Sequence, residues 1–406
     1  MKVVLSYNNL VLMFLSFFAV LNIFPIFKLL PFFNYLSFVF IAFYLFIVLH
    51  RKDRSYMKQD LDLLVTYFLI GISCLICFAT RNYSTGLNYI TFIFFPLLIS
   101  FSKIYLNDRK LLNKLFTIFL IALIFTGITT VGNLILDPYA SRLAQIKESA
   151  SFGYLLKGTG GYGFIYLCSI CLISLLPSLH NLHKYSLNSK IFLVLLSIIM
   201  FMAIMLSNFT IAYMIFFIGI GVFYIQIYPI RTSAIFGVIF IIFLMSFSFL
   251  QSIDIFTIKF ENMNLVKLLE IFNYLSSQEV GVYSSGRLER YQESLFGIVN
   301  YFPYGMANSP SINVLEEYGY GQHSFFLDTL ALFGIPLGLF IIFSIFGSLF
   351  RLKFKYKLCI YSFRASLVAF FLMCFLNIIS LENIMSVAII APVILAKLEN
   401  DFYHIS

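Results

Sequence analysis

The stretch LFTIFLIALIFTGITTVGNLIL, Leu115–Leu136, decides the fold class, because its twenty-two residues include no charge. A helix needs about twenty apolar residues to cross the hydrocarbon core of a bilayer. Similar runs recur along the chain, which is 61% hydrophobic and only 11% charged, with a mean hydropathy of +0.95. The runs are continuous rather than alternating, which favours helices over barrel strands. The sequence therefore predicts an all-α, polytopic integral membrane protein with a single membrane domain over residues 1–406.

About twelve membrane crossings are predicted on this basis. The N-terminal run has no small-residue cleavage site, so we expect it to remain as the first helix rather than to be removed as a signal peptide. The expected spans are Leu10–Phe27, Phe32–Leu49, Leu63–Ala79, Leu87–Phe101, Leu115–Leu136, Tyr162–Leu179, Ile191–Leu206, Thr210–Ile227, Ala234–Leu250, Phe325–Phe350, Ala365–Ile379 and Ile384–Leu398.

The basic residues predict the orientation of these spans, because lysine and arginine resist translocation. With the N-terminus inside, the basic clusters at 51–58, 103–114 and 351–364 fall on the cytoplasmic side. The short outer loops hold little beyond Lys28 and Arg81. The net charge of +9 is therefore expected to reflect topology and contact with anionic lipid headgroups, with no nucleic acid as a partner.

Two longer segments, 137–161 and 251–322, then both lie on the outer face, where the second forms a large periplasmic loop. The predicted inner loops are too short to form a nucleotide-binding domain. Any chemistry is therefore expected outside the cytosol, without direct use of ATP. Gly158–Gly163, the cluster GTGGYG, is expected to be a flexible loop rather than a phosphate cradle, because it follows no strand.

The six cysteines lie mostly in apolar runs, including CxxC spacings at Cys74/Cys77 and Cys168/Cys171. These runs supply no histidine partner, and cysteine is common as a small buried residue. Packing is therefore the expected role, and neither a metal nor a cofactor is predicted.

The most polar dozen residues, YSSGRLERYQES at Tyr283–Ser294, belong to the larger outer segment. Helical spacing predicts an amphipathic helix over about 286–302, capped by Ser285 or Gly286. Its apolar face, expected against the membrane surface or the bundle, holds Leu288, Tyr291, Leu295, Ile298 and Phe302. The opposite face holds Arg287, Arg290 and Ser294.

Free backbone N–H groups and two guanidinium groups at a helix start can bind a phosphate or a pyrophosphate. The alternative is an interfacial helix whose arginines touch only lipid headgroups. His323, at the start of the next apolar span in GQHSFFLDTLALFGIPLG, favours the first interpretation, because an imidazole at the outer boundary can act as a general base.

Four further positions in the same span carry expectations. Asp328 is an ionisable group within a membrane segment, so it is a functional candidate that would steer His323 or pair with an arginine. Gly334 and Gly338, with Pro336 between them, indicate close helix packing and a kink.

Residues 284–338 resemble the shared core of the bacterial O-antigen polymerase (Wzy) and O-antigen ligase superfamily. The two matching stretches are SSGRLERYQESLFGIVNYFPYGMA and QHSFFLDTLALFGIPLG. The resemblance rests on a Gly-Arg pair, a following aromatic residue, a Pro-x-Gly and a histidine that opens a helix with spaced glycines. In this chain these are Gly286, Arg287, Tyr291, Pro303, Gly305, His323, Leu327, Gly334 and Gly338.

The resemblance implies a GT-C-like, metal-independent glycosyltransferase of the bacterial inner membrane, with an active site that faces the periplasm. An undecaprenyl-pyrophosphate-linked oligosaccharide would be both donor and acceptor. Arg287 would bind the pyrophosphate, and His323 would activate or orient the acceptor hydroxyl. Asp328 and Tyr291 would support these two residues. A chain-length regulator of lipopolysaccharide biosynthesis would be a further protein partner.

Within this superfamily the sequence favours a polymerase that joins repeat units over a ligase that transfers finished chains to a lipid A core. The ligase branch often carries a Ser-x-Arg motif at the outer end of a mid-chain helix, whereas LSNFTIAY, Leu206–Tyr213, has no arginine. The second phosphate-binding residue therefore stays open between Arg290 and Arg142, the latter in the earlier outer segment.

A transporter or flippase is the alternative from another class. It would carry charged groups near the middle of several spans and interrupted helices arranged in repeats. Apart from Asp328 such charges are scarce, and no internal repeat is evident.

Overall fold

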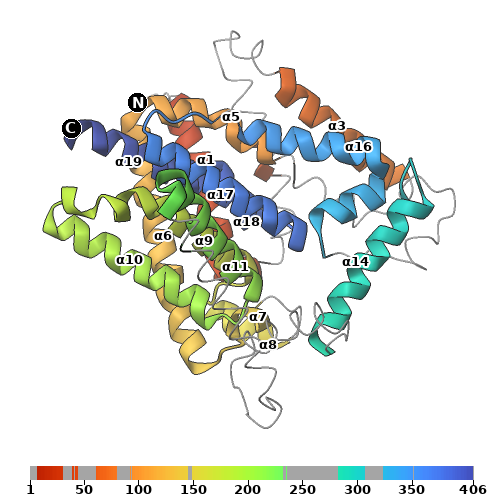
Figure 1. Cartoon of the computed structure of the whole chain (residues 1–406), viewed down its shortest axis with the longest axis horizontal. Helices are drawn as coiled ribbons and strands as arrows, with labels where there is room; N and C mark the ends of the chain where they lie inside the picture. Colours follow the sequence, from red (N-terminus) through yellow and green to blue (C-terminus); the bar gives the residue numbers. More distant parts are fainter. Residues whose placement is uncertain are drawn as a thin grey trace, which may run out of the picture.

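The computed structural model describes residues 7–30, 39–40, 42–43, 61–79, 92, 94–144, 149–231, 235, 282–306, 323–350 and 352–405. Within these ranges every regular element is a helix and there is no strand, so the prediction of an all-α chain is confirmed there (Figure 1). The predicted spans Phe32–Leu49 and Ala234–Leu250 lie almost wholly outside these ranges.

The helices of the described residues are labelled in chain order. The main ones are α1 Tyr7–Ile23, α3 Leu61–Ala79, α5 Phe94–Asn107, α6 Arg109–Leu136, α9 Tyr162–His180, α10 Leu187–Leu206, α11 Thr210–Ile227, α14 Val282–Asn300, α16 Phe325–Leu349 and α17 Lys357–Leu376. The C-terminal succession is α18 Leu381–Met385, η8 Ser386–Ile390 and α19 Ala391–Ile405. Shorter elements are η1 Pro25–Leu29, α7 Ala140–Leu143, α8 Ser149–Leu156 and η5 Leu182–Lys184.

Seven helical segments of the described chain are long and apolar enough to cross a membrane. They are Arg109–Leu136, Tyr162–His180, Leu187–Leu206, Thr210–Ile227, Phe325–Leu349, Lys357–Leu376 and Leu381–Asp401. Shorter apolar helices are Tyr7–Ile23, Tyr67–Cys77 and Phe94–Asn107. The chain therefore has the helices of a multi-pass membrane protein, while the count of about twelve crossings stays a prediction.

Two helix ends differ from the predicted spans for local reasons. The first helix ends at Ile23 rather than near Phe27, because Pro25 fixes its own backbone and restricts the residue before it, and Phe24 is extended. The helix containing Leu115–Leu136 begins earlier, at Arg109. Asp108 caps it by accepting the backbone N–H groups of Lys110 and Leu111 at 3.0 and 3.1 Å.

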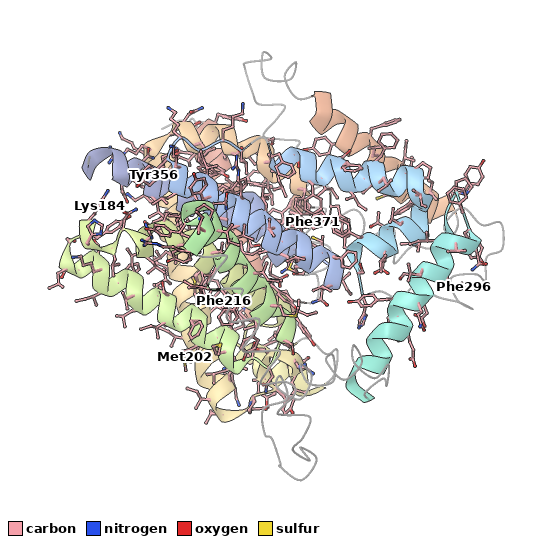
Figure 2. The ribbon with its side chains drawn as sticks, in the orientation of Figure 1. Lys184, Met202, Phe216, Phe296, Tyr356 and Phe371 are labelled. Carbon is pink, nitrogen blue, oxygen red and sulfur yellow. The ribbon has the colours of Figure 1, made fainter. Side chains whose placement is uncertain are left out.

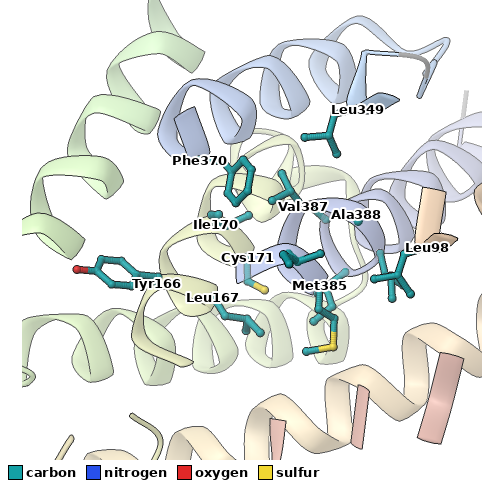
Figure 3. Packing of buried hydrophobic residues seen from close by; sticks show 14 of the residues in the cluster. Leu98, Tyr166, Leu167, Ile170, Cys171, Leu349, Phe370, Met385, Val387 and Ala388 are labelled. Atoms are coloured by element: carbon teal, nitrogen blue, oxygen red, sulfur yellow. The ribbon is translucent and has the colours of Figure 1, made fainter. Parts of the chain in front are cut away.

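The centre of the core is α9, which is buried at every position from Gly163 to Ser178. It contacts α10, α11, α17 and α19, so it is surrounded by helices from both halves of the chain. Figure 3 shows Ile170 and Cys171 of α9 among Phe370 of α17 and Val387 of η8. All six cysteines are buried and none forms a disulfide, in keeping with the packing role expected for them.

One charged contact joins the start of α9 to two other elements. Lys28 of η1 forms an ion pair with Glu382 of α18, whose side chain is only 8% exposed. Gly163 approaches this pair so closely that an added Cβ atom would lie 2.7 Å from Oε2 of Glu382 and 2.6 Å from Oγ of Ser380. The pair thus links η1 and α18 beside the core helix.

We expect Lys28→Met to lower the free energy of unfolding by about 3 kcal/mol, because Glu382 would keep a buried charge without its partner. Thermal unfolding of the purified protein in detergent measures this. The matched control is Lys184→Met, since Lys184 is exposed (Figure 2). Removing both charges in Lys28→Met/Glu382→Leu should cost less than the single change, and a double variant at least as unstable as Lys28→Met would contradict the assignment.

Candidate functional site

Helix α14 packs against the first half of α16, and this α14–α16 pair carries or adjoins the predicted site residues Arg287, His323 and Asp328. The C-terminal end of α14 contacts the middle of α16, near Gly334, and Ser294 of α14 contacts Asp328 nearer the start of α16. Positions that rise along α14 thus meet positions that rise along α16, so the two helices run in the same direction. Figure 1 shows α14 beside the first half of α16, at the edge of the bundle.

A kink at Gly334 divides α16 into two halves. Gly334 has φ 75° and ψ 167°, a conformation that favours glycine, and Pro336 follows it. An added Cβ atom on Gly334 would lie 1.8 Å from the carbonyl oxygen of Pro303. Gly305, with φ 79°, is equally tight, since its added Cβ would lie 2.2 Å from the backbone nitrogen of Gly334. The expected kink is confirmed, and its close contact is with the Pro-x-Gly segment after α14.

Asp328 is the buried carboxylate of the α14–α16 pair, with 4% of its surface exposed. Its Oδ1 atom accepts the Ser294 hydroxyl at 2.7 Å, and its Oδ2 atom accepts the Ser324 backbone N–H at 3.2 Å. Ser324 in turn caps α16 by accepting the Leu327 N–H at 3.2 Å. A negative charge in the first turn is also favoured by the helix dipole. The carboxylate thus contacts α14 and the residue that follows His323.

His323 is half-buried and lies directly before Ser324, the N-cap of α16. The backbone N–H of Phe325 donates to the carbonyl of Asn377 at 3.1 Å, and the Tyr291 hydroxyl donates to the carbonyl of Leu376 at 3.0 Å. The end of α17 therefore holds both α14 and the start of α16. These contacts place Tyr291 and the start of α16 against the same end of α17.

The two arginines of α14 differ in what the structure describes. Arg290 has a side chain that is 52% exposed and lies 3.5 Å from Glu293, an exposed pair that contributes little to stability. Arg287 lies one turn before Tyr291, and its side chain is outside the described residues.

The predicted start of the amphipathic helix is corrected by the structure. The helix spans Val282–Asn300 rather than about 286–302, so Ser285 and Gly286 lie inside it and do not cap it. The free N–H groups of its first turn therefore lie one turn away from Arg287.

The predicted faces of this helix are also corrected. Ser294, expected on the face away from the bundle, is buried against α16, because its hydroxyl pairs with Asp328. Gly297 allows the same approach, since an added Cβ would lie 2.5 Å from Sδ of Met306 and 3.1 Å from Cβ of Ala331. The Ser294–Asp328 hydrogen bond and the small size of Gly297 thus determine which face of α14 packs against α16.

The opposite side of α14 and the turn after it expose apolar side chains next to polar ones such as Gln292. Leu295, Phe296, Val299 and Phe302 are 48%, 47%, 73% and 65% exposed. Figure 2 shows Phe296 on the outer side of the helix. Of the residues predicted to pack, Tyr291 and Ile298 are partly buried, and the side chain of Leu288 is outside the described residues. An exposed apolar face of this kind suits contact with lipid.

Arg142 lies in α7, within residues 137–161, and reaches the turn between α10 and α11. Its Nη2 atom donates to the carbonyl of Asn208 at 3.3 Å, and its guanidinium carbon lies 5.5 Å from the ring centroid of Phe209. Phe209 also stacks on Tyr162 at the start of α9, with ring centroids 4.1 Å apart. The Nε atom of Arg142 is buried and has no hydrogen-bond partner in the described part of the chain. The arginine thus contacts the stretch Leu206–Tyr213, which has no arginine of its own.

The glycine cluster at 158–163 is held against α6 rather than free, which differs from the flexible loop that was expected. Thr129 of α6 donates its hydroxyl to the carbonyl of Gly158 at 2.8 Å, and Gly160 donates its N–H to Oγ1 of Thr130 at 2.8 Å. Residue 162 then starts α9. Nearby, the Tyr154 hydroxyl donates to Asp137, and this hydrogen bond raises the pKa of Tyr154.

A scan against protein-family models finds no match to this chain, and a search of curated proteins finds no relative. The function must therefore be inferred from the residues of the site and their arrangement.

Proposed function

We propose that this chain is an O-antigen or surface-polysaccharide polymerase of the bacterial inner membrane. It would join undecaprenyl-pyrophosphate-linked oligosaccharide repeat units on the outer leaflet, with the active site facing the periplasm. The observation that carries this proposal is the α14–α16 pair, in which Ser294 of the arginine-bearing helix contacts Asp328 of the helix that follows His323 at 2.7 Å.

Support comes from the positions of Arg287 and His323 along the two helices of the α14–α16 pair. Arg287 precedes Ser294 by seven residues, close to two helical turns. It therefore shares the face of Ser294 and lies about 10 Å closer to the N-terminal end of α14. His323 precedes Asp328 by four helical steps and one extended step, or about 9 Å in the same direction. Both residues are therefore expected at the same level, beyond the Ser294–Asp328 contact.

The chemistry that fits this arrangement is displacement of a pyrophosphate by a hydroxyl. The bond between sugar C1 and the pyrophosphate oxygen breaks, and a bond forms between C1 and the acceptor oxygen. The acceptor hydroxyl gives its proton to His323, and undecaprenyl pyrophosphate leaves with the electron pair. Arg287 stabilises the negative charge that grows on the leaving oxygen, and this interaction strengthens in the transition state.

Arg142 is the better supported of the two candidates for a second phosphate ligand. It contacts Asn208 and Phe209 at the outer end of α10, where ligases of the resembled superfamily often carry an arginine of their own. Its buried Nε atom keeps a donor for an incoming oxygen. Arg290, by contrast, is exposed and paired with Glu293.

Incubating the purified protein with a lipid-linked repeat unit alone tests the proposal. A polymerase yields a ladder of chain lengths on a gel. A ligase yields no ladder and transfers polysaccharide only after a lipid A core acceptor is added. A flippase lengthens nothing under either condition, and moves the lipid-linked unit across vesicles instead. Either of the last two outcomes contradicts the proposal.

A further inference from the structure

The carboxylate of Asp328 joins the two catalytic elements of the proposed reaction. One oxygen accepts the Ser294 hydroxyl from α14, and the other accepts the backbone N–H of Ser324, the neighbour of His323. Ser294 is 1% exposed and Asp328 is 4% exposed, so water does not compete freely for this contact. Burying a carboxylate costs free energy unless it is hydrogen-bonded. The Ser294 hydroxyl and the Ser324 N–H offset this cost for Asp328.

We propose that Ser294 and Asp328 are positioning residues that set the separation between Arg287 and His323. This inference rests on the proposed function for its effect on rate, although the geometry that it predicts can be measured independently. The hydrogen bonds that support this role join Ser294, Asp328 and Ser324, so the two residues would act on the reaction through the arginine and the histidine.

Other contacts already hold α14 and α16 together, so their association does not depend on this hydrogen bond. Gly297 packs against Met306 and Ala331, and Gly305 packs against the backbone of Gly334. Those contacts all lie on the side of Ser294 that leads to the kink. The Ser294–Asp328 bond is instead on the side that leads to Arg287 and His323, where it controls how closely the two helices approach.

The Ser324 N–H adds control of the histidine itself. Because Ser324 is the N-cap and follows His323 directly, a carboxylate that holds its N–H restricts the backbone that aims the imidazole. Misplacing a reacting group by about 1 Å can cost on the order of 100-fold in rate. Loss of the clamp should therefore lower the rate of the transfer step more than it lowers substrate binding.

The test compares Ser294→Ala with Ser348→Ala in the full-length purified chain. Ser348 is a matched control, because it is a buried serine of α16, the helix that carries Asp328, and its hydroxyl donates within that helix, to the carbonyl of Ile345 at 2.6 Å. We expect Ser294→Ala to lower kcat for chain elongation by about 10- to 100-fold. Its KM for the lipid-linked repeat unit should change by less than about threefold, and Ser348→Ala should leave both unchanged.

A conservative change and a second partner keep this test decisive. Ser294→Thr retains the hydroxyl and should restore most of the lost kcat, whereas Asp328→Asn should reproduce the loss, because an amide supplies only one acceptor oxygen. Wild-type kcat in Ser294→Ala, or failure of Ser294→Thr to recover activity while remaining folded, overturns the proposal.

A distance measurement separates this inference from the proposed function. Spin labels on Glu289→Cys in α14 and Leu327→Cys in α16 report the helix separation by electron resonance. We expect Ser294→Ala to broaden or shift this distance distribution, and Ser348→Ala to leave it as in the wild type. An unchanged distribution in Ser294→Ala rejects the positioning role even if polymer is made. A changed distribution in a chain that makes no polymer rejects only the proposed function.

Discussion

Arg287→Ala is expected to lower the rate of chain elongation by on the order of 100-fold, the usual cost of losing one donor that stabilises charge in a transition state. The leaving pyrophosphate gains negative charge as its bond to the sugar breaks, and a guanidinium fork contacts two of its oxygens at once. The measurement is the initial rate of ladder formation from a lipid-linked repeat unit, with the purified chain. Arg287→Lys should keep part of the rate, because it retains the charge but loses the fork.

Arg231→Ala is the matched control for this change. Arg231 is exposed and lies beyond the end of α11 that is opposite to Asn208 and Phe209. Its loss should leave elongation unaltered. His323→Ala should reduce elongation as strongly as Arg287→Ala, if the imidazole accepts the proton of the acceptor hydroxyl. Elongation at the wild-type rate in either Arg287→Ala or His323→Ala would remove the basis for the proposed site.

Gly334→Ala is expected to have the largest effect on stability, at about 2 to 5 kcal/mol. About 1 to 2 kcal/mol comes from holding a side chain at positive φ, and about 1 to 3 kcal/mol comes from overpacking. The added methyl would lie 1.8 Å from the carbonyl oxygen of Pro303, and backbone cannot turn aside as a side chain can. Thermal unfolding in detergent, together with the amount of protein in the membrane, measures the loss.

Gly347→Ala provides the comparison within the same helix. Nothing lies within 4 Å of an added Cβ at Gly347, and its backbone is helical. This change should be neutral or stabilising by up to about 1 kcal/mol, because alanine favours a helix more than glycine does. Equal stability of the Gly334→Ala and Gly347→Ala variants would show that the kink does not depend on the contact with Pro303.

The sequence predicts well what depends on composition and on glycine or proline. The uncharged run Leu115–Leu136 lies within α6, and Gly334 with Pro336 marks the kink that is observed. These features follow from local rules that need no knowledge of distant residues. The predicted end of the first helix is wrong because it uses hydropathy alone, whereas Pro25 ends the helix earlier.

The sequence could not predict the contacts that orient α14. Ser294 and Asp328 are 34 residues apart, and their hydrogen bond exists only once α14 packs against α16. Hydrophobic periodicity assigns a serine to the exposed face, but a buried acceptor together with the small Gly297 reverses that assignment. A search for a serine and a carboxylate at matching depths of neighbouring apolar helices would be the signal to use.

The exposed apolar side of α14 has a consequence for how a polyprenyl donor reaches the site. Leu295, Phe296, Val299 and Phe302 form an apolar flank at the C-terminal end of α14, opposite to the end that bears Arg287. Under the proposed function, the isoprenoid tail contacts this flank and stays among the acyl chains, while its diphosphate reaches Arg287 at the other end of the helix. Encounter then becomes lateral diffusion in two dimensions, so occupancy depends on the mole fraction of donor in the leaflet and not on its amount per unit volume.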